Sequence, residues 1–243
     1  MALVYRLDVP NLGRCTLRNG PRMKTYIPAL RFHFATGLYD PVVRWTTREA
    51  TFKAALVAGL DPLDGERILD LGCGTGTLAI AIARAAPGAV VSGLDADEAA
   101  LAQARAKQAR SGTSVQWSRG LAQHLPFPEG VFDAVVSSLF FHHLLRSDKR
   151  AALLEIARVL RPGGRVLIAD WGQPANVASR LLFLAVQLLD GFATTRDSVQ
   201  GVLPSLMTEA GFEDVRIARQ FATALGTLAI YSGRRTQGGE NGA

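Results

Sequence analysis

The sequence predicts an α/β fold with a mostly parallel sheet, on three observations. Between residues 62 and 212, short apolar stretches alternate with helical stretches of about 10–15 residues, the pattern of βαβ units. A glycine-rich turn joins the first apolar stretch directly to a helix. The last two strand-like stretches are joined by a short turn, which suits an antiparallel hairpin because a parallel connection needs a dozen or more residues.

The elements follow from local patterns. A helical stretch begins near Pro41 and ends at Leu60, with an apolar face of Val43, Phe52, Ala55, Leu56 and Leu60. Proline and glycine end the helices at Pro87-Gly88 and at Gly112, and "RPGG" interrupts the chain at 161–164. Strands are expected at 67–72, 89–95, 113–120, 132–138, 165–171, 214–221 and 225–233, and helices at 77–86, 97–112, 148–160 and 202–212.

The ends of the chain differ from this core. Residues 1–22 are polar and show no sustained period, so they are expected to be a disordered arm or the product of a mis-assigned gene start. One domain is expected over 23–235, and the polar, glycine-rich residues 236–243 are expected to be a disordered tail.

Composition narrows the class of protein. The net charge is +6, but residues 1–31 carry +5 of it, so the rest is nearly neutral and no nucleic-acid partner is expected. Two distant cysteines, Cys15 and Cys73, do not have the spacing of a metal site or a disulfide framework. No stretch has the roughly 18 apolar residues of a membrane span or the apolar region of a signal peptide, so a cytoplasmic protein is expected, with peripheral membrane contact still allowed.

The turn "DLGCGTG" at 70–76 carries the chemistry. Glycine permits a tight turn and lets backbone groups touch a ligand, as in nucleotide-binding folds. The spacing Gly72-x-Gly74-x-Gly76 differs from the G-x-G-x-x-G of dinucleotide-binding folds, and the lysine of a phosphate-binding loop is missing. Asp95 ends the next strand, where an acid can accept hydrogen bonds from both hydroxyls of a ribose. A nicotinamide dehydrogenase is therefore disfavoured.

Four stretches together resemble the class I S-adenosylmethionine-dependent methyltransferases. They are "ILDLGCGTG", "GLDAD", "LPFPEGVFDAVVSSLFFHHL" and "EIARVLRPGGRVLIADW", and the resemblance is strongest to the ubiquinone/menaquinone C-methyltransferase-like group. It covers about residues 35 to 233. The resemblance implies a Rossmann-like sheet of seven strands, mostly parallel with an antiparallel last strand and helices on both faces.

The resemblance also implies a cofactor, S-adenosylmethionine, and its site. Asp70 and Gly72 match the positions around the cofactor's ammonium group, and Asp95 matches the ribose-binding acid. Leu121 replaces the acid that usually precedes the adenine-contacting alanine, which leaves Gln123 or a backbone carbonyl for that contact. The full expected set is Asp70, Gly72, Cys73, Gly74, Gly76, Asp95, Ala96, Ala122 and Ser137.

Methyl transfer from a sulfonium needs orientation and desolvation, plus a base where the nucleophile must lose a proton. Two histidines follow the fourth strand, and His143 is preferred as the base because His142 is expected to turn toward the following helix. The alternative interpretation is that both histidines have only a structural role. Tyr39, Phe140 and Trp171 are candidate contacts to the substrate.

The acceptor is expected to be a small hydrophobic or aromatic molecule of quinol, lipid or metabolite type. Residues 172–205, where this family places a substrate-covering insertion, are rich in leucine. Ring C-methylation and phospholipid-amine N-methylation stay open, and no Asp/Asn-Pro-Pro-aromatic motif favours the methylation of nucleic-acid bases. The alternative function is a non-catalytic S-adenosylmethionine-binding or regulatory protein.

Overall fold

The computed structural model describes residues 49–237. The predictions for the arm at 1–22, the domain start at 23 and Tyr39 lie outside this range. The described elements are α2 (Glu49–Leu60), β1 (Arg67–Leu71), α3 (Thr77–Ala85), β2 (Val90–Asp95), α4 (Glu98–Ala109), β3 (Gln116–Arg119), β4 (Phe132–Ser138), η1 (Phe141–His143), α5 (Arg146–Val159), β5 (Leu160–Trp171), α6 (Val177–Asp190), α7 (Phe192–Gln200), α8 (Leu203–Glu209), β6 (Phe212–Thr223) and β7 (Gly226–Arg235).

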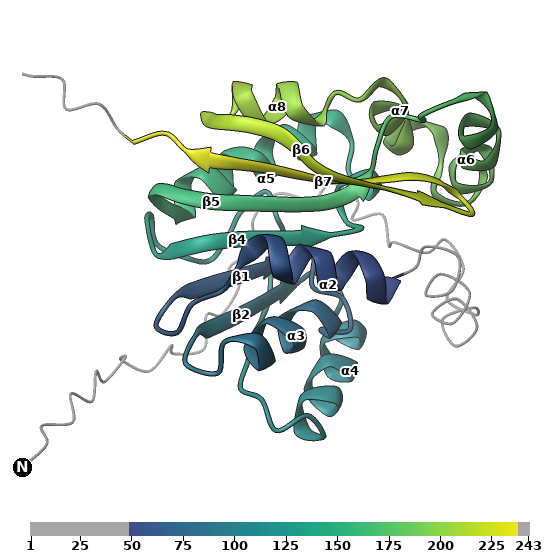
Figure 1. Ribbon diagram of the computed structural model, residues 1–243. Helices are drawn as coiled ribbons and strands as arrows, with labels where there is room; N and C mark the ends of the chain where they lie inside the picture. The colour runs from purple at the N-terminus through teal and green to yellow at the C-terminus, as the bar shows by residue number, and fades with distance from the viewer. Residues whose placement is uncertain (1–48, 238–243) are drawn as a thin grey trace, which may run out of the picture.

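One seven-stranded sheet forms the centre of the molecule, in the order β3-β2-β1-β4-β5-β7-β6 (Figure 1). The neighbours from β3 to β5 are all parallel, and β7 is antiparallel to both β5 and β6. The strand order reverses between β1 and β4, and the crevice outside the carboxyl ends of such strands is the usual ligand site of this kind of sheet. The predicted sheet, with its antiparallel last strand, is confirmed.

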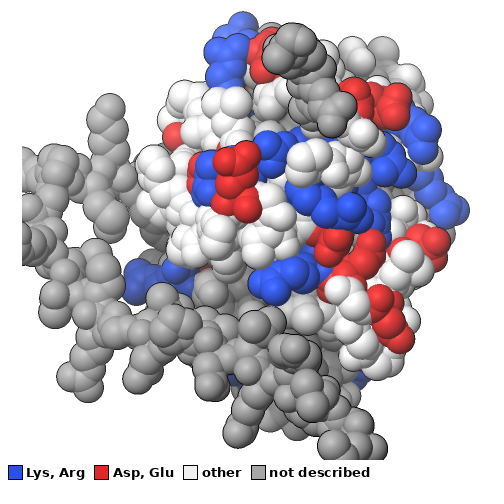
Figure 2. All heavy atoms as spheres, turned by 90° about the vertical axis from the view of Figure 1, so that its left-hand side faces the viewer, with Lys and Arg blue, Asp and Glu red and all other residues white. Residues whose placement is uncertain are grey.

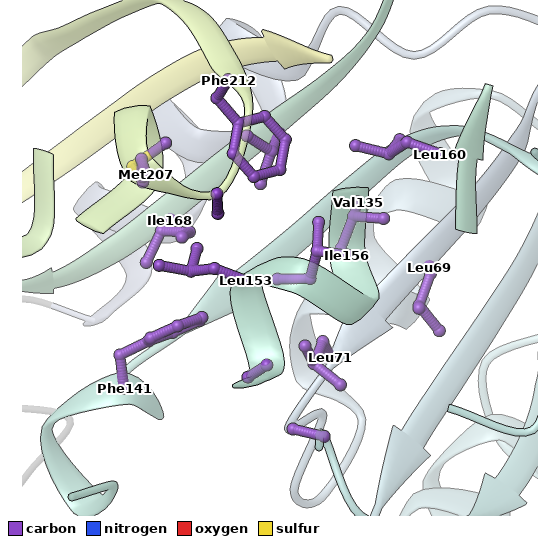
Figure 3. Close-up of a cluster of buried hydrophobic side chains, with 14 of the residues drawn as sticks. Leu69, Leu71, Val135, Phe141, Leu153, Ile156, Leu160, Ile168, Met207 and Phe212 are labelled. Atoms are coloured by element: carbon purple, nitrogen blue, oxygen red, sulfur yellow. The ribbon is translucent and has the colours of Figure 1, made fainter. Parts of the chain in front are cut away.

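Alternating side chains of the strands build two separate cores. Ile68, Val136 and Leu167 point to the face covered by α2 and α3, where Phe52 and Leu56 of α2 are fully buried. Leu69, Val135 and Ile168 point to the other face, which α5 and α8 cover with Leu153, Ile156 and Met207 (Figure 3). Because successive residues of a strand face opposite sides and helices cover both faces of the sheet, a central strand carries apolar residues on both of its faces.

β5 is longer than the sequence predicts. The expected break at Arg161-Pro162-Gly163-Gly164 lies inside the strand, because Leu160 pairs with Phe132 before Arg165 pairs with Ala134, with an irregularity between them. A side chain at Gly164 would lie 2.8 Å from the Arg161 carbonyl oxygen. The glycine is therefore required by a close backbone approach within the irregular strand.

The segment predicted to cover the site contains two helices. α6 and α7 lie together at the end of the sheet to which the parallel strands point, at the right in Figure 1. The buried residues Phe183 and Val186 attach α6 to Trp171 of β5. At the far end of the chain, Thr236 still donates a backbone hydrogen bond to the Gly211 carbonyl, and the rest of the predicted tail from residue 238 lies outside the described range.

Basic and acidic side chains are interleaved on the opposite end of the molecule (Figure 2). Ion pairs join Arg165 to Glu66 at 2.7 Å, Arg161 to Asp133 at 2.6 Å and Arg235 to Glu129 at 2.9 Å, all near the amino ends of parallel strands or the end of β7. Within residues 49–237, no helix has the length and apolar character needed to cross a membrane.

Candidate active site

The glycine turn between β1 and α3 is attached to β2. The backbone N–H groups of Gly72 and Cys73 both donate to the Leu94 carbonyl oxygen, at 2.8 and 3.1 Å. Gly72, Gly74 and Gly76 all have positive φ angles, of 69°, 52° and 75°, which side-chain-bearing residues rarely adopt. Local backbone geometry therefore requires the alternating glycines predicted from the sequence.

The three glycines exclude side chains for different reasons. A Cβ atom at Gly72 would collide with the ring of Phe140, and one at Gly76 would lie 2.5 Å from the ring of Trp117. At Gly74 a Cβ atom would meet nothing within 4 Å. Two of the glycines thus accommodate neighbouring aromatic rings, and only Gly74 faces open space that a ligand can fill.

Asp70 lies on β1 directly before this turn and is 1% exposed. Its Oδ2 accepts a hydrogen bond of 3.0 Å from the backbone N–H of Ala79, in the first turn of α3. Its Oδ1 is buried and has no partner. Burial raises the pKa of Asp70 to about 7, and the charge of Lys53 and the Ala79 hydrogen bond oppose this rise. An unpaired oxygen on a buried carboxylate is a site for a cation or a hydrogen-bond donor.

Asp95 ends β2 on the other side of the turn. Its Oδ2 accepts from the backbone N–H of Gly74 at 2.8 Å, and its Oδ1 accepts from that of Asp97 at 2.9 Å. Burial raises the pKa of Asp95, against the effect of these hydrogen bonds. A carboxylate has about four acceptor positions, so Asp95 can accept two further bonds from ribose hydroxyls.

The remaining cofactor candidates surround this pair. Cys73 is buried in the turn, and desolvation raises the pKa of its thiol, so it stays neutral. The Ala96 carbonyl accepts from Arg119 Nε at 3.2 Å. Ala122 packs in the core, which leaves only its backbone for a ligand, and Leu121 beside it is 38% exposed. These positions fit S-adenosylmethionine: an unpaired carboxylate oxygen for its ammonium, Asp95 for its ribose and open space above Gly74.

The end of β4 lies beside the glycine turn. Ser137 is buried, and its hydroxyl donates to the Leu71 carbonyl at 2.8 Å, so this side chain connects β4 to β1. Phe140 packs against Gly72. The short helix η1, which carries both histidines, therefore begins at the edge of the predicted cofactor site.

His142 is held by the neighbouring strand. Its Nδ1 lies 2.7 Å from Oδ1 of Asp170, and its backbone N–H donates to Oδ2 of the same carboxylate at 3.1 Å. The backbone N–H of Trp171 donates to Asp170 Oδ1 at 2.7 Å. Burial opposes ionisation of Asp170, but the imidazole and these hydrogen bonds outweigh it and lower its pKa. A carboxylate on Nδ1 fixes the imidazole tautomer and makes Nε2 the atom that gains or loses a proton.

His143 has a different environment. Its ring stacks on His142 with the centroids 3.9 Å apart. Burial and the nearby His142 lower the pKa of His143 to about 3, against the effect of Asp170. The sequence argument expected His142 to turn toward the following helix, whereas the hydrogen bond directs it to β5. His142 is thus the histidine that contacts the Asp170 carboxylate through its ring, and this differs from the preference for His143 in the sequence analysis.

An ion cluster that the sequence analysis missed joins the covering segment to α5. Lys149 of α5 is 3% exposed and donates to Asp197 Oδ2 and to the Thr194 carbonyl of α7, at 3.0 and 2.8 Å. Arg146 donates to Asp197 Oδ1 at 2.9 Å through Nε. Burial raises the pKa of Asp197, but the two cations outweigh it and keep the pKa low. No local sequence signal distinguishes a buried lysine from a solvated one on an amphipathic helix.

Comparisons with known proteins agree with this site. Residues 68–164 match the family model described as a methyltransferase domain. The chain is 35% identical over 188 residues to the demethylmenaquinone methyltransferase of Thermus thermophilus, covering 70% of this chain and 83% of that protein. It is 32% identical over 203 residues to the ubiquinone/menaquinone biosynthesis C-methyltransferase UbiE of Paracoccus denitrificans, covering 75% and 79%.

A solved structure supports the fold alone. The S-adenosylmethionine-dependent methyltransferase of Methanosarcina mazei superposes with a TM-score of 0.58 at 20% identity, covering 70% of this chain and 92% of that one. Since the glycine turn, the acid at the end of β2, the sheet topology and the sequence relatives agree, the cofactor is S-adenosylmethionine. The chain belongs to the class I S-adenosylmethionine-dependent methyltransferases, in the group of the ubiquinone/menaquinone C-methyltransferases.

Proposed function

We propose that the enzyme methylates a ring carbon of a hydrophobic hydroxyaromatic acceptor of quinol type. The relatives from Thermus thermophilus and Paracoccus denitrificans carry names that refer to menaquinone and ubiquinone, which favours a quinol over the phospholipid amine that the sequence analysis left open. The carrying observation is the buried His142–Asp170 pair beside the glycine turn, because methylation of a ring carbon requires a base that removes a proton from the acceptor.

On the cofactor side, bound S-adenosylmethionine supplies an activated methyl group on its sulfonium. The chain positions it. In the proposal Asp95 accepts hydrogen bonds from the ribose, Asp70 Oδ1 faces the ammonium, and the open space at Gly74 accommodates the ligand. Ala96 and the backbone of Ala122 lie along the adenine.

On the acceptor side, His142 is the proposed base. With Nδ1 directed to Asp170, Nε2 takes the proton that the acceptor loses, and the carboxylate stabilises the resulting imidazolium. His143 is less suited, because an imidazole with a pKa of about 3 is a weak base at neutral pH.

The apolar surroundings suit a hydrophobic acceptor. Trp171 and Phe183 meet edge to face with their ring centroids 5.5 Å apart, and Leu139 and Leu225 pack against them. In the proposal Phe140 and Trp171 contact the acceptor, and the segment 172–205 excludes water from it. Excluding water strengthens the electrostatic effect of the His142–Asp170 pair.

The acceptor is tested by incubating the full chain with S-adenosylmethionine and two substrates in parallel. One is a reduced naphthoquinol with a short isoprenoid chain and an unsubstituted ring position, and the other is phosphatidylethanolamine in mixed micelles. Mass spectrometry should find one added methyl group on the quinol ring. Methylation of the phospholipid alone would contradict the proposal, and cofactor binding without turnover of either would favour the non-catalytic alternative.

The base is tested with His142→Gln and Asp170→Asn, with His143→Gln as the matched control. The first two should leave the cofactor affinity within about twofold, and His142→Gln should lower kcat by about 10²–10⁴-fold, the usual contribution of a general base. The loss should come with the disappearance of the acidic limb of the pH–rate profile. A kcat that falls more in His143→Gln than in His142→Gln would reverse the assignment.

A further inference from the structure

Three buried polar side-chain atoms have no hydrogen-bond partner in the described part of the chain: Asp70 Oδ1, Arg180 Nη1 and Gln187 Oε1. Leaving such an atom buried and unpaired is costly, so each one needs an explanation. Asp70 lies at the cofactor site. The other two lie on α6, in the segment that covers the carboxyl end of the sheet.

Arg180 and Gln187 share one face of α6. They are seven residues apart, which is close to two helical turns and about 10 Å along the axis, and Phe183 lies between them on the same side. Phe183 is 1% exposed and contacts Trp171, which in turn lies edge-on to His142 with the ring centroids 6.4 Å apart. The face of α6 that carries the two unpaired atoms is therefore turned toward the end of β5 and the proposed base.

The orientation of the Gln187 amide follows from its neighbours. Its Nε2 donates to Thr195 Oγ1 at 3.3 Å, and the Thr195 hydroxyl proton is used in a bond of 2.6 Å to the Gly191 carbonyl. A rotated amide would place its oxygen against a hydroxyl that has no proton left to donate. Gln187 is 3% exposed, so Oε1 is a fixed and buried acceptor that lacks a donor.

Arg180 lacks an acceptor for Nη1, and a guanidinium cannot lose its charge in a protein. Two acids of the neighbouring elements are already paired. Asp170 accepts from His142 and two backbone groups, and Asp197 accepts from Arg146 and Lys149. The missing acceptor for Arg180 Nη1 would be supplied by an oxygen of a ligand, above all a phenolic or phenolate oxygen.

We propose that Arg180 and Gln187 bind the two oxygens of the acceptor ring. Arg180 donates to one oxygen, and Gln187 Oε1 accepts the hydroxyl proton of the other, so the site selects a dihydroxyaromatic ring over a ring with one hydroxyl or none. The charge of Arg180 favours ionisation of the oxygen that it contacts, which increases electron density on the ring carbons. This inference rests on the proposed acceptor class and adds its recognition elements.

The test is calorimetric binding to the full chain saturated with S-adenosylhomocysteine. The probes are 1,4-dihydroxynaphthalene, kept reduced under argon, and 1,4-dimethoxynaphthalene, which has no hydroxyl proton. Gln187→Leu should lower the affinity for the diol about fivefold, and Arg180→Met should lower it about tenfold or more. These losses are in line with hydrogen bonds to neutral and to charged groups. Gln187→Leu should not change the affinity for the dimethoxy probe by more than about twofold, because that probe has no hydroxyl proton for Oε1 to accept.

Two matched controls separate recognition from folding. Arg196→Met makes the same exchange at an exposed position of α7, and Leu188→Gln makes the reverse exchange at the exposed neighbour of Gln187 on α6; both should bind the diol as the parent does. Gln187→Leu should melt no lower than the parent, because it removes a buried unpaired oxygen. If the parent binds the diol and both site variants bind it equally well, the recognition by α6 is refuted while the acceptor class stands. If the parent does not bind the diol, the acceptor class fails and the inference fails with it.

Discussion

Protonation of Asp70 should control the affinity for S-adenosylmethionine. The carboxyl group is buried beside the glycine turn with a pKa of about 7, so about half of the ligand-free molecules carry it protonated at neutral pH. A cationic ammonium against Oδ1 favours the ionised form, so binding should lower this pKa and release a proton. Because binding requires the ionised carboxylate, affinity should fall as the pH falls through 7.

The magnitude follows from the ionised fraction. With a pKa of about 7, that fraction falls from about one half at pH 7 to about one tenth at pH 6, so the dissociation constant should rise about fivefold. The number of protons released should rise from about 0.5 to about 0.9 over the same interval. The ligand's own amino group, with an ordinary pKa of about 7.7–8.0, stays protonated throughout and does not add to the effect.

Titration calorimetry in two buffers of different ionisation enthalpy measures both the dissociation constant and the number of protons released. Asp70→Asn is the control, because its side-chain oxygen can still accept from Ala79 while its charge no longer depends on pH. The variant should bind more weakly at pH 7 and lose the proton release. An absence of proton release by the parent at pH 6, or an unchanged release in the variant, would refute the argument.

Three further substitutions test the glycine turn and Asp95. Asp95→Ala should weaken cofactor binding by about 1.5–3 kcal/mol in calorimetry, the scale of hydrogen bonds to a charged group, and unchanged affinity would remove Asp95 from the ribose site. Gly74→Val should abolish binding because the added atoms enter the open space; circular dichroism should still show a folded protein, though a less stable one because φ is positive here, and cofactor affinity at the parent level would exclude this space as the ligand site. Gly72→Ala should instead lower the unfolding free energy, by about 1–3 kcal/mol in urea, because φ is positive and the added methyl group would collide with the Phe140 ring. An unchanged midpoint of urea unfolding would contradict this close packing.

The sheet was predictable because its strands carry strong local signals. The predicted strand 132–138 has an apolar centre in Ala134, Val135 and Val136, and β4 begins and ends where that prediction does. The short turn before Gly226 correctly indicated an antiparallel β7. Seven strands were expected from local patterns and were also implied by the family resemblance, and the structure confirms that number.

Close contacts within the fold were not predictable in the same way. The Pro162-Gly163-Gly164 sequence is a typical chain break, yet the neighbouring strand keeps the chain extended through an irregular pairing. The glycines of the turn looked equivalent in the sequence, but two of them accommodate Phe140 and Trp117, which come from distant parts of the chain. Sequence spacing indicates that a side chain is excluded and does not indicate what excludes it.

The choice between the two histidines depended on the same kind of information. Adjacent residues of a short helix point in different directions, so the sequence implied that the two rings have different surroundings, as the structure shows. It could not indicate which ring meets Asp170, because that contact joins elements 28 residues apart. Burial and the nearby His142 lower the pKa of His143, which makes the assignment testable.

The unpaired oxygens of Asp70 and Gln187 have one common consequence. Asp70 Oδ1 on β1 and Gln187 Oε1 on α6 are buried without a donor, and each destabilises the ligand-free fold. A bound ligand that supplies the missing donor removes that cost, so part of the affinity comes from relief of strain already present in the protein. Replacing either side chain by one that needs no donor should therefore stabilise the ligand-free protein and lower its affinity for the ligand. This opposite sign separates a binding residue from a structural one, whose loss would lower both.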